Sequence, residues 1–180
     1  MDNLPLKVPE NVIFEQAIAL TKSLLSLVDA GEIKELEIST IVSELVKTEN
    51  GARGFFVTYL TSESSLADNP PTAVVQALRT SPEVAELLVK NLAMSAAQTL
   101  FHRRNHKEDM AHSSEQVHKR TARLIELTNL PAVYDRLQQM QETITRGEGS
   151  YKAFLERWGY DTEQRQVISQ ALQQVISHQK

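Results

Sequence analysis

Residues 81–101 read SPEVAELLVKNLAMSAAQTLF, and this stretch decides the fold. Pro82 suits the first turn of a helix, where its missing N–H removes no hydrogen bond. The residues that follow as far as Phe101 are mainly apolar and include no Gly or Pro, so they predict one long helix. A membrane span needs ~20 mostly apolar residues. This stretch is too polar for that, because it is interrupted by Glu86, Lys90, Asn91, Ser95, Gln98 and Thr99.

Helix start and stop signals recur on both sides of this stretch. They predict helices over 10–28, from Ser39 or Thr40 to a stop at Asn50-Gly51, from Asn69-Pro70-Pro71 to Leu78, from a capping box at Ser113-Ser-Glu-Gln116 to Thr128, from Pro131 to Gly147, over 150–157, and from a second capping box at Asp161-Thr-Glu-Gln164 to Ile176. Residues 54–61 are ambiguous, because their β-branched and aromatic content is typical of a strand. A lone strand would lack a pairing partner, so we expect a helix there and leave the strand open.

The connections between these segments are short, and the chain contains no repeat of fixed period and no low-complexity tract. We therefore expect an all-α fold. It is a compact bundle of about seven or eight helices with mostly antiparallel neighbours, and residues 1–180 form a single domain.

Composition excludes several chemistries. The chain has no cysteine, so disulfides, a thiol nucleophile, iron–sulfur clusters and cysteine-bound zinc are ruled out. It has no Gly-x-Ser-x-Gly elbow, no P-loop and no dinucleotide fingerprint. We expect no enzyme activity and no cofactor. The first ten residues lack the pattern of a signal peptide, which favours a cytoplasmic protein.

Charge is unevenly distributed along the chain. The net charge is −4, yet residues 99–123 carry six Lys/Arg against three Asp/Glu, which leaves −7 for the remainder. A basic surface of this kind suits an acidic protein partner, where it would set orientation and association rate more than affinity. The candidate partner-binding residues are Arg103, Arg104, Lys107, Lys119, Arg120 and Arg123.

Four of the five histidines lie in the same region. His102 and His106 are four residues apart, and on a continuous helix Asp109 would share their face. Two imidazoles and a carboxylate could bind Zn, Fe or Mn. The alternative is a solvated polar face at the end of a buried helix. Glu115 and His118 have the Glu-x-x-His spacing of di-iron bundles, but such sites need two copies and the chain has one.

The same basic residues could contact nucleic acid. Phe101 is the only aromatic residue nearby, so base stacking has little support. The globally acidic chain is also repelled by phosphate backbones and by anionic membranes. We therefore favour a protein partner over nucleic acid and over a membrane.

Three runs resemble those of uncharacterised, conserved cyanobacterial proteins of similar length. They are Ala52-Arg-Gly-Phe-Phe-Val-Thr-Tyr-Leu-Thr61, Leu87-Leu-Val-Lys-Asn-Leu-Ala-Met-Ser95 and Arg157-Trp-Gly-Tyr-Asp161. The resemblance implies no activity and no cofactor, and points to the cytoplasm of a prokaryote.

Three hypotheses follow. The first is a non-enzymatic helical interaction or regulatory module that binds another protein. The second is a metal-dependent enzyme or sensor built on His102, His106 and Asp109. The third is a nucleic-acid binder that uses the basic residues 103–123. Apolar stripes left over from the core could also form a homo-oligomer.

Overall fold

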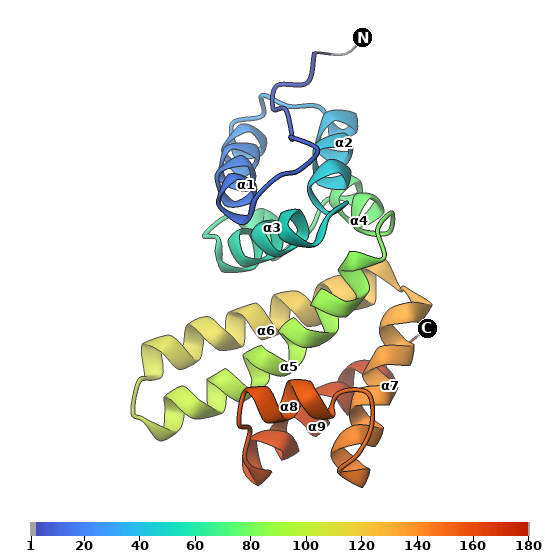
Figure 1. Cartoon of the computed structure of the whole chain (residues 1–180). Coiled ribbons are helices and arrows are strands. Elements are labelled where there is room, and N and C mark those ends of the chain that lie inside the picture. The colour runs from blue at the N-terminus through green and yellow to red at the C-terminus, as the bar shows by residue number, and fades with distance from the viewer. Residues whose placement is uncertain (1–2, 180) are drawn as a thin grey trace. The chain divides into compact units, whose positions relative to one another are not determined.

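The computed structural model describes residues 3–179, and within them it contains nine α-helices, one 3₁₀ turn and no strand (Figure 1). The elements in order are α1 (Phe14–Asp29), α2 (Glu35–Leu45), α3 (Glu49–Thr61), η1 (Ser65–Ala67), α4 (Thr72–Leu78), α5 (Glu83–Arg104), α6 (Glu108–Thr128), α7 (Pro131–Arg146), α8 (Lys152–Arg157) and α9 (Thr162–Ser177). The all-α prediction is confirmed. None of the described helices combines the length and apolar character needed to cross a bilayer.

The chain divides into two compact units, Met1–Leu87 and Leu88–Lys180. The first holds α1 to α4 and the start of α5, and the second holds the rest of α5 and α6 to α9. That both units form one domain remains a prediction from the sequence.

The ambiguous residues 54–61 lie within α3 and form the aromatic centre of the first unit. Phe55, Phe56 and Tyr59 are each about 1% exposed. The rings of Phe55 and Tyr59 stack at a centroid distance of 5.1 Å, and the Tyr59 hydroxyl donates a hydrogen bond to the carbonyl of Leu66. The aromatic residues that favour a strand are here required to fill the core around a helix.

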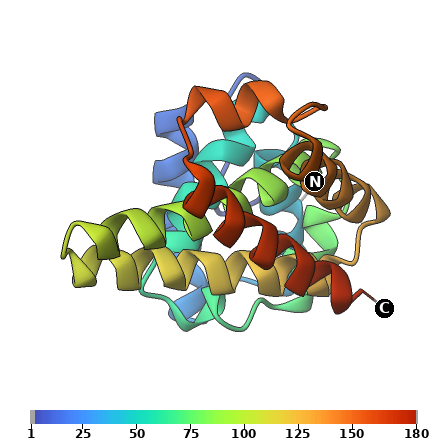
Figure 2. The ribbon, with the colours of Figure 1, turned by 90° about the horizontal axis from the view of Figure 1, so that it is seen from below.

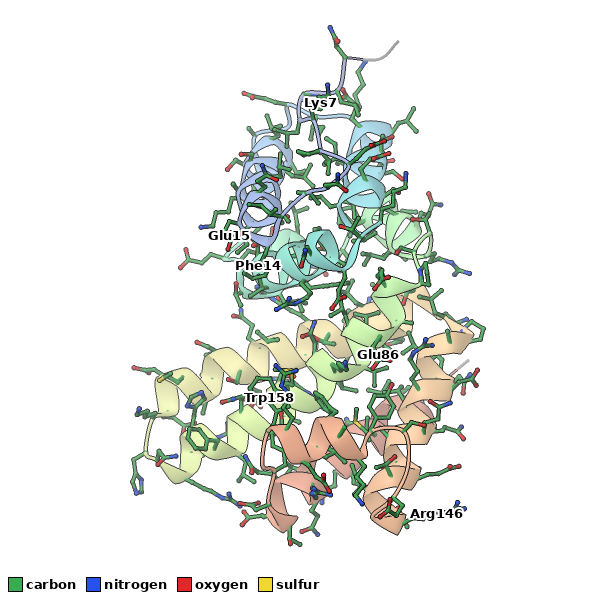
Figure 3. The ribbon with its side chains drawn as sticks, in the orientation of Figure 1. Lys7, Phe14, Glu15, Glu86, Arg146 and Trp158 are labelled. Carbon is green, nitrogen blue, oxygen red and sulfur yellow. The ribbon has the colours of Figure 1, made fainter. Side chains whose placement is uncertain are left out.

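The closest approach of α1 and α3 depends on Gly54. A Cβ at this position would lie 2.5 Å from the Cβ of Ala17 and 2.8 Å from the carbonyl oxygen of Phe14. Glycine weakens a helix, but at position 54 in the middle of α3 there is no room for a larger side chain. Phe14 and Glu15, at the start of α1, are labelled in Figure 3.

The second unit is built on α5 and α6, which run side by side in opposite directions in both Figure 1 and Figure 2. Leu92 of α5, Leu124 of α6, Leu137 of α7 and Leu172 of α9 are fully buried. On α6 the buried residues Thr121, Leu124, Ile125 and Thr128 recur with helical spacing, as an amphipathic helix requires.

The predicted start and end of α7 and the predicted start of α9 are confirmed. α7 begins at Pro131 and ends at Gly147, whose φ of 75° is the left-handed conformation that favours glycine. The capping box before α9 is reciprocal. The carboxylate of Asp161 accepts from the Gln164 amide at 2.8 Å, and the Gln164 side chain accepts from the Asp161 amide at 3.0 Å.

Three predicted ends are wrong. α2 begins at Glu35 rather than after Ser39, because the carboxylate of Glu37 satisfies the Lys34 amide at 3.0 Å. Residues 50–51 do not end a helix but lie in the first turn of α3, where the Thr48 hydroxyl caps Gly51. Ser113 lies inside α6 and donates to the carbonyl of Asp109, so its segment caps nothing.

Candidate functional site

The turn between α5 and α6 separates the three proposed metal ligands. α5 ends at Arg104, α6 begins at Glu108, and His106 between them has a φ of 55°. The continuous helix that would place His102, His106 and Asp109 on one face is therefore absent. Among the residues that the structure describes, no group of three or more His, Cys, Asp or Glu side chains could hold a metal ion. The helical argument for the metal hypothesis is wrong.

Arg103 and Arg104, at the end of α5, form ion pairs with other helices of the second unit. The Arg103 guanidinium contacts the carboxylates of Glu108 at 3.3 Å and Glu115 at 3.1 Å. Arg104 contacts Asp161 at 2.6 Å and Glu163 at 2.8 Å, at the start of α9. Arg104 thus ties the end of α5 to the capping box of α9.

Arg104 and Asp161 each stabilise the charged form of the other. The hydrogen bond from Arg104, followed by that from the Gln164 amide, lowers the pKa of Asp161 below its usual range. The hydrogen bonds from Asp161 and Glu163 raise the pKa of Arg104. Both groups therefore stay charged at neutral pH, and their role is structural.

The other four basic candidates are dispersed. Lys107 is exposed in the turn before α6, and Arg120 is only 3% exposed and belongs to the interior of the second unit. Lys119 and Arg123, one helical turn apart on α6, are exposed and lie together. Of the six basic candidates, Lys119 and Arg123 thus lie on a common surface of α6.

That surface is a groove between α6 and α9 with a volume of about 480 Å³. We call it the α6–α9 groove. It is lined by Glu115, His118, Lys119, Ala122, Arg123, Glu126, Gln174, Val175 and His178. Its apolar lining side chains are Ala122 and Val175, of which Val175 is 8% exposed. Along α6 its charges run from a carboxylate through two cations to a second carboxylate.

The two ion pairs of the groove are long and exposed. Lys119 Nζ lies 3.8 Å from a carboxylate oxygen of Glu115, and Arg123 Nη1 lies 3.8 Å from one of Glu126. The side chains of the two cations are 73% and 52% exposed. Ion pairs of this kind contribute little to stability, so both cations can exchange partners at small cost.

His118 gives the groove a buried imidazole. Its ring bonds the backbone carbonyl of Leu92, while Nδ1 is buried and has no hydrogen-bond partner. Burial lowers the pKa of His118 below its ordinary value of 6.5. The ring is therefore neutral at pH 7, and donation from Nε2 to Leu92 leaves Nδ1 as an acceptor. At the other wall, His178 Nδ1 lies 2.6 Å from the carbonyl of Gln174.

Exposed apolar side chains lie elsewhere in the second unit. Phe101 and Met110 are 48% and 49% exposed near the turn between α5 and α6. Trp158, labelled in Figure 3, is exposed at the end of α8, where the guanidinium carbon of Arg157 lies 5.6 Å from its ring centre. These three residues are not among those that line the α6–α9 groove.

The wall that α9 contributes was missed by the sequence analysis. Gln174, Val175 and His178 lie far along the chain from α6, and only the packing of α9 brings them to it. The apolar periodicity of α9 could have indicated that one of its faces meets another helix. It could not have indicated which helix.

Residues 13–175 match the model of a family described as uncharacterised conserved protein UCP020893. The chain belongs to that family. No curated protein and no solved structure matches the chain. The description of UCP020893 carries no activity, so the α6–α9 groove has to be interpreted from its own chemistry.

Proposed function

We propose that this protein is a non-enzymatic interaction module that binds an acidic protein segment in the α6–α9 groove. The observation that carries the proposal is the placement of Lys119 and Arg123 beside the apolar surface of Ala122 and Val175. A segment with a carboxylate next to an apolar side chain satisfies both features at once. It would neutralise the cations and cover the apolar surface.

The charges of the groove define the segment that fits. Glu115 and Glu126 lie on either side of the two cations along α6 and repel a carboxylate placed beyond them. The negative charge of the partner must therefore fall between them, which fixes its register. Such charges set association rate and orientation more than affinity.

Arg103 and Arg104 are poor choices for testing the proposal. Both already contact carboxylates of their own unit, so reversing Arg103 would disturb its contact with α6, and reversing Arg104 would disturb the start of α9. The proposal therefore rests on Lys119 and Arg123, whose own ion pairs are long and exposed.

The test is direct binding of labelled peptides to the full-length protein, followed by fluorescence anisotropy. A peptide with Glu residues around a Leu is expected to bind more tightly than the same peptide with Lys, and to weaken between about 50 and about 300 mM salt. The variant K119E/R123E is expected to lose roughly tenfold or more in affinity for the acidic peptide.

The matched control is K7E/K47E, which reverses two exposed lysines of the first unit. It makes the same change in net charge at residues that do not line the groove and is expected to bind like the wild type. Circular dichroism checks that both variants keep their helical content. Equal binding of acidic and basic peptides, or full binding by K119E/R123E, would contradict the proposal.

We place this module in the cytoplasm of a cyanobacterium. The support is the likeness of three sequence runs to those of cyanobacterial proteins. Cell fractionation with an antibody against the protein tests the location, and recovery from the membrane pellet would contradict it.

A further inference from the structure

The charge of the chain is divided between its two units. The first unit, residues 1–87, has six Lys/Arg against thirteen Asp/Glu, a net charge of −7. The second unit, residues 88–180, has thirteen Lys/Arg against ten Asp/Glu, a net charge of +3. One chain therefore carries both an acidic unit and, on its cationic unit, the groove whose Lys119 and Arg123 are proposed to bind acidic segments.

The first unit also presents the kind of segment that the groove fits. Residues 29–37, which we call the acidic turn, connect α1 to α2 and begin α2. Asp29, Glu32 and Glu35 are exposed there, and Lys34 is the one cation among these residues. The turn is thus a local concentration of negative charge on an acidic unit.

Leu36 lies in the middle of this charge and is 74% exposed. Acidic residues at a helix start are explained by the helix dipole. No such reason explains a leucine at the second position of α2, where its own unit leaves most of the side chain uncovered. Single exposed leucines are common, but this one combines with carboxylates in the pattern that the groove favours.

We propose that the acidic turn of one copy docks in the α6–α9 groove of a second copy of this chain. Leu36 covers the apolar surface of Ala122 and Val175, while Glu32 and Glu35 face Lys119 and Arg123. This inference rests on the proposed function, because it takes the groove as the docking site, and it names the partner.

The contact has a definite symmetry. It joins two different surfaces, so it is heterologous, and each added copy leaves one free groove and one free acidic turn. Association therefore continues beyond a dimer unless the rotation closes a ring. Because the contact depends on exposed charges, it weakens as salt rises.

The first experiment is sedimentation velocity of the full-length protein from about 1 µM to about 1 mM, at low and high salt. The wild type is expected to associate as concentration rises and to dissociate at high salt. The variant L36S, which changes an exposed side chain, is expected to associate roughly tenfold more weakly. A wild type that stays monomeric at every concentration would overturn the inference.

A charge exchange tests the pairing itself. The variant E32K/E35K has a basic turn and keeps Lys119 and Arg123, and K119E/R123E keeps the acidic turn and has an acidic groove. Each is expected to be monomeric alone. When they are mixed, the basic turn of the first variant meets the acidic groove of the second, the acidic turn of the second meets Lys119 and Arg123 of the first, and association is expected to return. Variants that still self-associate, or a mixture that stays monomeric, would overturn the inference.

The two proposals fail in different ways. If the protein binds the acidic peptide but never self-associates, the second copy is the wrong partner and the groove remains a docking site. If neither the peptide nor a second copy binds, both proposals are wrong. K7E/K47E serves as the control for K119E/R123E in each experiment.

Discussion

Gly54→Ala is the substitution whose effect the structure determines most directly. In the interior of an exposed helix, replacing Gly by Ala stabilises a protein by about 1 kcal/mol. In α3 the new Cβ would lie 2.5 Å from the Ala17 Cβ and 2.8 Å from the Phe14 carbonyl oxygen. Carbon atoms in contact are normally about 3.5–4.0 Å apart. The two helices must therefore separate by about 1 Å.

The magnitude follows from the opposing terms. Overpacking of a well-packed core typically costs about 1–3 kcal/mol. The cost here lies towards the upper end, because Phe14 O and Ile18 N are backbone atoms that no rotamer change can move. After the gain in helix propensity is subtracted, Gly54→Ala is expected to lower the free energy of unfolding by about 1–2 kcal/mol.

Urea unfolding followed by circular dichroism at 222 nm measures this difference. The exchange variant Ala17→Gly with Gly54→Ala removes the closest contact and keeps one Cβ at the crossing. It is expected to be more stable than Gly54→Ala alone, although the contact with Phe14 remains. A Gly54→Ala variant as stable as the wild type would refute the account of how α1 and α3 pack.

Two further predictions concern pH. Because burial lowers the pKa of His118, the unfolded chain binds a proton that the folded chain resists, so stability falls as pH drops below about 6.5. In His118→Gln the fall in melting temperature between pH 7.5 and 5.5 is expected to be smaller, and an unchanged fall would contradict the placement of this ring. Because Arg104 lowers the pKa of Asp161, that carboxylate stabilises the fold at neutral pH and ceases to do so as pH falls through its lowered pKa. Asp161→Ala is expected to melt below the wild type at pH 7 and to approach it in acid; a constant difference would show that the charge is irrelevant.

Local signals predict much of this fold, because many helix ends depend on residues close in sequence. In the structure α7 begins at Pro131 and is capped at its end by Gly147, and α9 is capped at its start by Asp161. These are the positions that the three residue types favour. The start of α2 was missed because its first residues are held by Glu37, three residues inside the helix, and Lys34 itself has no side-chain acceptor. The capping box predicted at Ser113 was wrong because a serine hydroxyl can equally donate a hydrogen bond to a carbonyl within a helix.

The candidate site is less predictable, for a physical reason. The sequence shows that basic residues gather near α6, but not which of them meet a carboxylate from elsewhere. Arg104 meets Asp161 and Lys119 faces a groove because of how α9 packs, and that packing is set by the whole second unit. The histidines were grouped on a helix that the turn at His106 interrupts.

The measurement that tests the central claim most directly is a nuclear magnetic resonance titration of the labelled protein with an acidic, leucine-containing peptide. The account predicts that the amide shifts concentrate in residues 115–126 and 174–178, the two walls of the α6–α9 groove. Shifts concentrated around Phe101 and Met110, or none at peptide concentrations near 1 mM, would contradict it.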